Sequence, residues 1–210
     1  MVKTVVFFVN LLVLTVLSFA QDQSFAVELQ YSYSKTDSLN LIQQQFLPKG
    51  CILYGNDKRV VQKINFGMVS MIRIADAGSD SILNYVSAMG NKVWYKSPTP
   101  VEEKPFEIKL TDKKITKEAY TLDLAIGVNK GKKFPIYYLK GINTPLFPRF
   151  KHLAGVPLQY KLEGIEMGMD ILVHILWYKN NIPNDLNTEL PSGYRKATKE
   201  DFENFSGFFN

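Results

Sequence analysis

Strand-forming residues dominate the stretch Lys58-Arg-Val-Val-Gln-Lys-Ile-Asn-Phe-Gly-Met-Val-Ser-Met-Ile-Arg-Ile-Ala-Asp76, which decides the fold. Two runs rich in Val, Ile and Met, near 58–65 and 68–75, are separated by the turn residues Asn65-Phe-Gly67. Turn residues also separate similar runs near 51–55, 81–89 and 92–96, and Gly90-Asn91 is typical of a two-residue hairpin. The pattern predicts a β-meander of five strands.

The meander lies within a longer series of strands. Residues 25–34 alternate between apolar and polar side chains, which is typical of a half-buried strand. Further strands are expected near 106–110, 115–128, 134–139, 156–163 and 167–178, which makes about eleven. A sheet this large must curl or close to hide its edges. The sequence therefore predicts a mainly β protein, with a curled antiparallel sheet (a half-open barrel) covered by short helices.

The segment 144–154 is the main predicted helix. Thr144 is a suitable N-cap, and Gly155 suits the position after the last turn. Shorter helices are expected between 37 and 48 and after Thr198-Lys-Glu-Asp201, which resembles a capping box. The apolar side chains of the main helix would form one broad face, comprising Leu146, Phe147, Phe150, Leu153 and Ala154.

The first twenty residues have the features of a secretory signal peptide. Lys3 precedes the apolar run 5–17, and Ser18-Phe-Ala20 places small residues where a signal peptidase cleaves, so cleavage is expected before Gln21. The expected organisation is a signal peptide (1–20) and a single β domain (21–210) in the periplasm or outside the cell. Cys51 is the only cysteine, which excludes an internal disulfide.

The strand expected at 167–178 points to a ligand or a partner. Both of its faces are largely apolar, so the strand should be covered on both sides, one of them by helices. The second cover is either more protein or a bound apolar molecule, and the sequence leaves both open. The candidate ligand-binding residues are those of the helix, acting as a lid, and of one strand face: Phe147, Phe150, Leu153, Leu172, His174, Leu176 and Tyr178.

No pattern indicates catalysis. The chain has two histidines, His152 and His174, and it lacks a nucleophile elbow, a zinc-protease motif, paired cysteines and a phosphate-binding loop. Asp76 and Asp80 flank Gly78 in a manner that turn chemistry explains better than cation binding. The formal net charge of +5 comes from scattered lysines rather than a basic stripe with aromatics, so nucleic acid is not expected as a partner. We expect no enzyme, cofactor or metal.

Several short motifs resemble those of a known family. In chain order they are Asn56-Asp-Lys-Arg-Val60, Met71-Ile-Arg-Ile-Ala-Asp76, Gly90-Asn-Lys-Val93, Gly155-Val-Pro-Leu158, Ile182-Pro-Asn-Asp185 and Leu190-Pro-Ser-Gly-Tyr194. The chain resembles the secreted Bacteroidetes proteins related to the GLPGLI family, and distantly the LolA and LolB lipoprotein carriers. The resemblance implies an incomplete barrel whose apolar concave face is covered by short helices. In the carriers this cavity holds acyl chains.

Two functions follow as expectations. The first is a non-catalytic protein that binds or carries a lipid or other apolar molecule in the concave face of its sheet. The second is an envelope interaction module with a filled core, whose loops, such as 97–105, contact a protein partner. A monomer is expected in either case.

Overall fold

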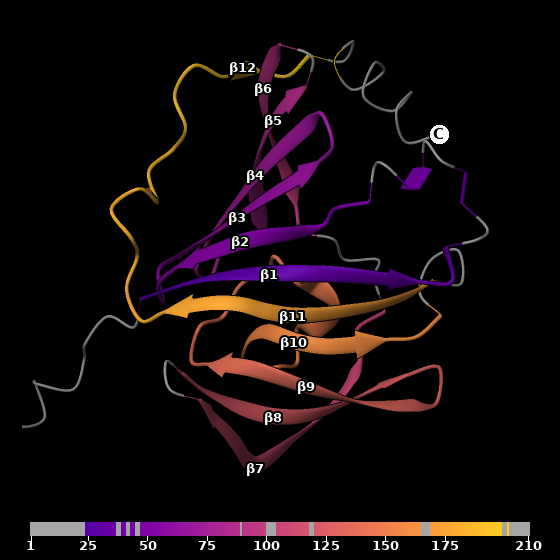
Figure 1. Ribbon diagram of the computed structural model, residues 1–210. Helices are drawn as coiled ribbons and strands as arrows, with labels where there is room; N and C mark the ends of the chain where they lie inside the picture. The colour runs from indigo at the N-terminus through magenta and orange to yellow at the C-terminus, as the bar shows by residue number, and fades with distance from the viewer. Residues whose placement is uncertain are drawn as a thin grey trace, which may run out of the picture.

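The computed structural model describes residues 24–36, 39–40, 43–44, 47–88, 90–99, 104–117, 120–164, 169–198 and 201. Twelve strands form one sheet in this part of the chain (Figure 1), which confirms the mainly β class. In chain order they are β1 (Phe25–Ser34), β2 (Gly50–Gly55), β3 (Arg59–Phe66), β4 (Val69–Asp76), β5 (Ser81–Ala88), β6 (Asn91–Pro98), β7 (Glu107–Lys117), β8 (Tyr120–Asn129), β9 (Lys132–Lys140), β10 (Gly155–Leu162), β11 (Asp170–Lys179) and β12 (Arg195–Lys196).

The first strand lies in the middle of the sheet, between β2 and β11. On one side β2 to β6 follow in chain order, and on the other side β10 to β7 follow in reverse order. All neighbours are antiparallel except β12, which pairs with β6 in parallel through two residues. We call β2–β6 with β12 the N-terminal half and β7–β10 the C-terminal half. The sequence predicts the number of strands except for β12, which is too short to give a pattern. The expected break between strands 106–110 and 115–128 is wrong, because β7 continues through it to Lys117.

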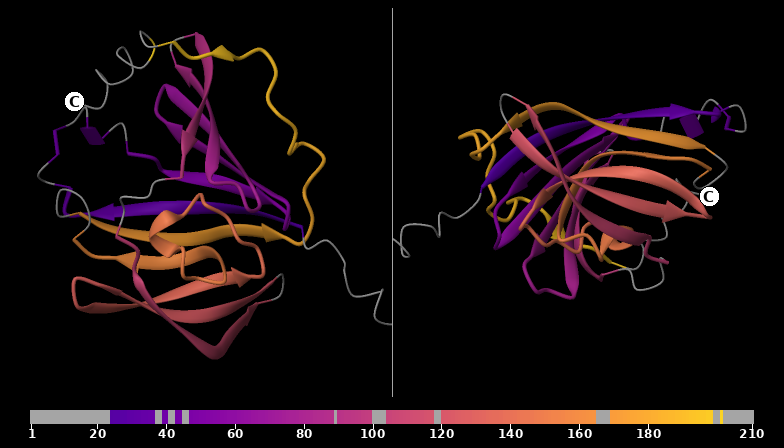
Figure 2. Two further views of the ribbon diagram at one scale, coloured as in Figure 1. Left: turned by 180° about the vertical axis from the view of Figure 1, so that it is seen from behind. Right: turned by 90° about the horizontal axis from the view of Figure 1, so that it is seen from below.

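The sheet is open, neither closed nor strongly curled, so the expected half-open barrel is not observed (Figure 2). The protein hides its apolar surface in another way. We call the face that carries Val27, Leu53 and Val173 the inner face, and on it Ile142 and Leu146 of the β9–β10 connection complete a continuous core. A sheet covered by its own connecting segment can bury its core without curling further. Its edges are protected by the shortness of β12 and by the lysines of β7.

The predicted helix at 144–154 is wrong. The structure has a single 3₁₀ turn there, η2 (Pro148–Phe150), and in Figure 2 this connection lies over β10 and β11 when seen from behind. Phe147 precedes the turn without a capping side chain, and Pro148 has no backbone N–H to donate. The Thr144 hydroxyl accepts a bond from the N–H of Leu146 at 3.3 Å and so closes a local turn. Gly155 begins β10 instead of ending a helix.

The opposite, outer face of the N-terminal half is covered by the C-terminal segment (residues 180–194). Ile182, Leu186 and Tyr194 pack there against a buried cluster that includes Tyr54. The Tyr54 hydroxyl donates to the carbonyl of Asn187 at 2.8 Å.

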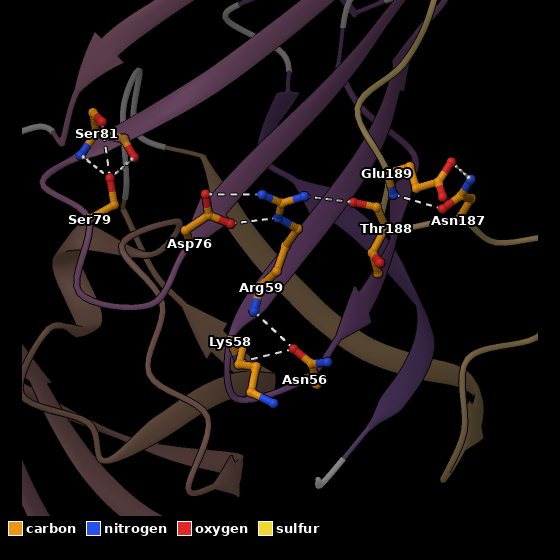
Figure 3. Close-up of polar contacts among 9 residues, drawn as sticks. All are labelled: Asn56, Lys58, Arg59, Asp76, Ser79, Ser81, Asn187, Thr188 and Glu189. Atoms are coloured by element: carbon orange, nitrogen blue, oxygen red, sulfur yellow. Dashed lines mark hydrogen bonds and ion pairs between the residues drawn. The ribbon is translucent and has the colours of Figure 1, made fainter.

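The same segment is also held by the β3–β4 hairpin. Arg59 donates to the carbonyl of Thr188 at 3.2 Å while both carboxylate oxygens of Asp76 bind its guanidinium group (Figure 3). The Ser79 hydroxyl lies beside the Ser81 hydroxyl in the next turn. Asp76 therefore orients the arginine that holds the C-terminal segment.

The other expected helices fall mostly outside the described residues, as does the whole signal peptide. Gln43 and Gln44 are helical, and the residues around them are not described. Thr198 and Asp201 do form the reciprocal bonds of a capping box, with the Thr198 N–H donating to Asp201 at 2.7 Å and the Asp201 N–H donating to Thr198 at 3.3 Å. No helix within the described ranges is long and apolar enough to cross a membrane.

Candidate functional site

A bulge in β11 divides the predicted binding residues between the two faces of the sheet. The pairing of β1 with β11 shifts at Leu176, which lies opposite no residue of β1. Leu172 and His174 precede the bulge and lie on the outer face, whereas Tyr178 follows it and packs in the inner core. Strict alternation along the strand would place Leu172, His174, Leu176 and Tyr178 on one face, which was the prediction from the sequence. The seven predicted residues therefore do not form a single site.

The predicted lid residues belong to the packed inner face. Phe150 and Leu153 are buried, at 6% and 4% exposure, and Phe147 is half-buried. The Phe150 ring lies 5.1 Å from the ring of Phe106, edge-to-face, and 4.9 Å from that of Tyr160. These contacts make the β9–β10 connection part of the core.

A short chain of polar groups crosses the inner face between β1 and β4. The Tyr31 hydroxyl donates to Cys51 Sγ at 3.0 Å, the Gln62 amide approaches the same sulfur at 3.7 Å, and Arg73 donates to Gln62 at 3.1 Å. Burial raises the pKa of the Cys51 thiol and, even more, that of the Tyr31 hydroxyl. Both groups stay protonated at neutral pH, so the cluster supplies hydrogen bonds rather than a thiolate nucleophile.

A hollow of the described surface lies mostly on the outer face, across β1–β4. This outer groove has a volume of about 1190 Å³ and begins where the cover of the C-terminal segment ends. Its floor includes the aliphatic side chains of Ile52 and Ile72, and Leu176 projects into it from the bulge. Its polar lining residues are Glu28, Gln30, Gln44, Lys49, Lys63, Asn65 and Ser70.

Hydrogen bonds between β1 and β11 fix one wall of the outer groove. His174 Nε2 lies 2.7 Å from Gln30 Oε1, and the Trp177 indole N–H donates to a Glu28 carboxylate oxygen. Gln30 and Glu28 lie on β1, and His174 and Trp177 lie on β11. These hydrogen bonds therefore fix the side chains of β1 that line the groove. Of the residues predicted from the sequence, Leu176 lines this groove and His174 supports it.

The floor of the groove, formed by Ile52 and Ile72, was not predicted from the sequence. A signal for it exists in β2 and β4, where Ile52, Ile72 and Ile74 occupy outer positions although Leu53 and Ala75 of the same strands already pack in the inner core. Strands apolar on both faces must be covered or hollowed on both. A cover or a hollow on the second face is therefore expected for β2 and β4, as it was for the strand at 167–178.

Within the described part of the chain, no three His, Cys, Asp or Glu side chains are grouped closely enough to hold a metal ion. The groove offers carboxamide, ammonium, carboxylate and aliphatic groups.

The fold is similar to part of a larger solved protein. No protein-family model matches the chain, and no curated protein matches it by sequence. Two crystal forms of PNGF-II, in space groups C2 and P21, are similar, each with a TM-score of 0.51 and with 12% and 11% identity. They cover 89% and 87% of this chain, which spans 33% of the PNGF-II chain. At this identity the likeness concerns the fold alone.

Proposed function

We propose that the protein is a non-catalytic binding protein for a lipid or other amphipathic apolar molecule, and that the outer groove is its binding site. The observation that carries the proposal is the outer groove itself, an open volume of about 1190 Å³ with an aliphatic floor. The inner face, where a concave cavity was expected, is filled by Phe150, Leu153 and their neighbours. The proposed site therefore moves to the other face of the sheet.

The groove is suited to a chain with a polar end. Each methylene group removed from water contributes about 0.8 kcal/mol, so about six groups over Ile52, Ile72 and Leu176 contribute about 5 kcal/mol. Lys49 and Lys63 line the same groove and can pair with an anionic head group. The apolar contacts alone correspond to a dissociation constant on the order of 0.1 mM, which pairing with the lysines would lower.

The setting of this function is part of the proposal. The n-region, the apolar run and the small residues before Gln21 support export and cleavage, which would leave a monomer in the periplasm or outside the cell. The resemblance to GLPGLI-related proteins, and distantly to LolA and LolB, supports a lipid as the ligand class. The absence of a catalytic motif in the sequence supports a non-enzymatic role.

A matched pair of leucines tests the site. Leu176 and Leu172 lie on the same strand and are 53% and 41% exposed, but only Leu176 lines the groove. Leu176→Glu should weaken binding of a fluorescent fatty-acid probe by about tenfold or more, since a carboxylate replaces apolar contact and repels the anionic head. Leu172→Glu should leave the affinity within about twofold. Equal effects of the two variants, or a wild type that takes up no probe, would contradict the proposal.

A second candidate is an envelope interaction module with a filled core, and the packing of the inner face favours it. Native mass spectrometry of the exported protein separates the two candidates. A co-purifying lipid supports the binding protein. A co-purifying protein, together with no probe uptake, supports the interaction module.

A further inference from the structure

The C-terminal half has a net positive charge, whereas the rest of the chain is slightly negative. Residues 104–164 contain twelve Lys and Arg against five Asp and Glu, whereas the rest of the chain has thirteen against fifteen. The strands β7 to β10 that this range encodes are neighbours in the sheet. The strand order therefore places the lysines of this range together at one end of the molecule.

A second groove lies on this basic end, over β7, β8 and β9. Its volume is about 650 Å³. Two rows of cross-strand neighbours form most of it, and each row has one lysine at one end and an aliphatic residue at its centre. The rows are Lys109–Ile126–Pro135 and Glu107–Val128–Lys133.

Other described residues do not cover the outer face of β7–β9. Ile126 and Val128 are half-buried, Lys109, Lys133 and Pro135 are exposed, and no buried cluster forms over them among the described residues. The groove combines an aliphatic centre with two lysines and one carboxylate, Glu107, on an uncovered sheet face. This combination suits a surface that is anionic outside and apolar beneath. Lysine stems can follow the apolar surface while their ammonium groups reach phosphates.

We propose that the outer face of β7–β9 docks on the surface of an anionic lipid bilayer. Lys109 and Lys133 contact lipid phosphates, and Ile126, Val128 and Pro135 rest against the interfacial region. This docking is separate from ligand binding in the outer groove, which lies on the N-terminal half and at β1. The two sites leave the protein able to hold a ligand while bound to a membrane.

Two observations favour a bilayer over an acidic peptide paired along β7. The β7–β8 pairing is irregular between Leu110 and Lys114, which interrupts the straight edge that an added strand needs. Lys133 lies on β9, an interior strand, so protection of a free edge does not explain it. A flat, multivalent anionic surface uses both lysines at once.

The test is co-sedimentation of the full exported chain with vesicles. One set contains phosphatidylcholine alone and the other about one third phosphatidylglycerol. We expect binding to the anionic set only, and weaker binding at high salt. Lys109→Glu with Lys133→Glu should lower the partition coefficient by about 25-fold or more, because each lysine near an anionic surface contributes about fivefold.

The control makes the same change of charge elsewhere. Lys96→Glu with Lys196→Glu alters exposed lysines of the N-terminal half and should change partitioning by less than about threefold. Circular dichroism verifies that both double variants are folded. Equal losses in the two would show that only net charge matters and would overturn the proposal. Binding to both vesicle types, to neither, or only to an acidic peptide would overturn it as well.

Discussion

The two halves of the sheet differ in how many of their faces are covered. In the N-terminal half, the consecutive residues Val60, Val61 and Gln62 of β3 are all buried, because the core covers one face and the C-terminal segment covers the other. In the C-terminal half, no residue of the edge strand β7 is fully buried, and the outer face of β7–β9 is open. The N-terminal half is a scaffold with a groove where its second cover ends. In the C-terminal half, residues 155–158 of β10 are all buried as well, so only β7–β9 form a layer with an open, basic outer face.

The largest effect should come from the aromatic cluster around Phe150 in the C-terminal half. Phe150→Ala removes a buried ring from between Phe106 and Tyr160 and should lower the free energy of unfolding by about 3–5 kcal/mol. Urea denaturation measures this loss. Phe147→Ala, in the same connection but half-buried, is the control and should cost clearly less. Similar losses for both would mean that the connection is not anchored through Phe150.

The next effect concerns the second cover of the N-terminal half. Burial raises the pKa of Tyr54 to about 12, so its hydroxyl remains a donor to the Asn187 carbonyl. Tyr54→Phe removes that bond and should cost about 1 kcal/mol, with faster proteolysis within 180–194. Tyr85→Phe keeps the ring contact of Tyr85 with Tyr194, 5.3 Å between centroids, and serves as control. Unchanged proteolysis in Tyr54→Phe would show that apolar packing alone holds the segment.

The smallest effect should occur where the halves meet. The backbone N–H of Gly164 and then Lys35 hold the pKa of Asp170 below its ordinary 3.8. A carboxylate with a depressed pKa stabilises the fold fully above its unfolded pKa and loses this contribution as the pH falls through its folded pKa. Asp170→Asn should therefore be less stable than the wild type at about pH 6, with a smaller difference at about pH 3. Urea midpoints at both pH values test this, and a pH-independent difference would contradict it.

The strands could be predicted from the sequence because each carries its own pattern and turn residues. The meander over 51–96 is found within a few residues of its observed bounds. The helix at 144–154 could not be excluded, since Leu146, Phe150 and Leu153 have helical spacing. In the structure these residues belong to an irregular connection with one 3₁₀ turn, and all three side chains are buried in the core.

The site was less predictable because it depends on register. One unpaired residue at Leu176 reverses the face on which Tyr178 lies, and no local pattern marks this bulge. The outer groove also depends on where the C-terminal segment stops covering the sheet, which is a matter of tertiary packing. His174 and Leu176 were identified as binding residues from an apolar pattern, and the structure places them on the groove side of β11.

The position of β1 also has a consequence for the order of folding. Ala26 pairs with Lys179, so one edge of the central strand stays open until β11 has been made. The N-terminal meander can form early from local hairpins, but the link between the halves closes a very long loop. Such non-local pairing slows folding to the range of milliseconds to seconds. During that interval the apolar edge of β1 is the region of the molecule most exposed to misassembly.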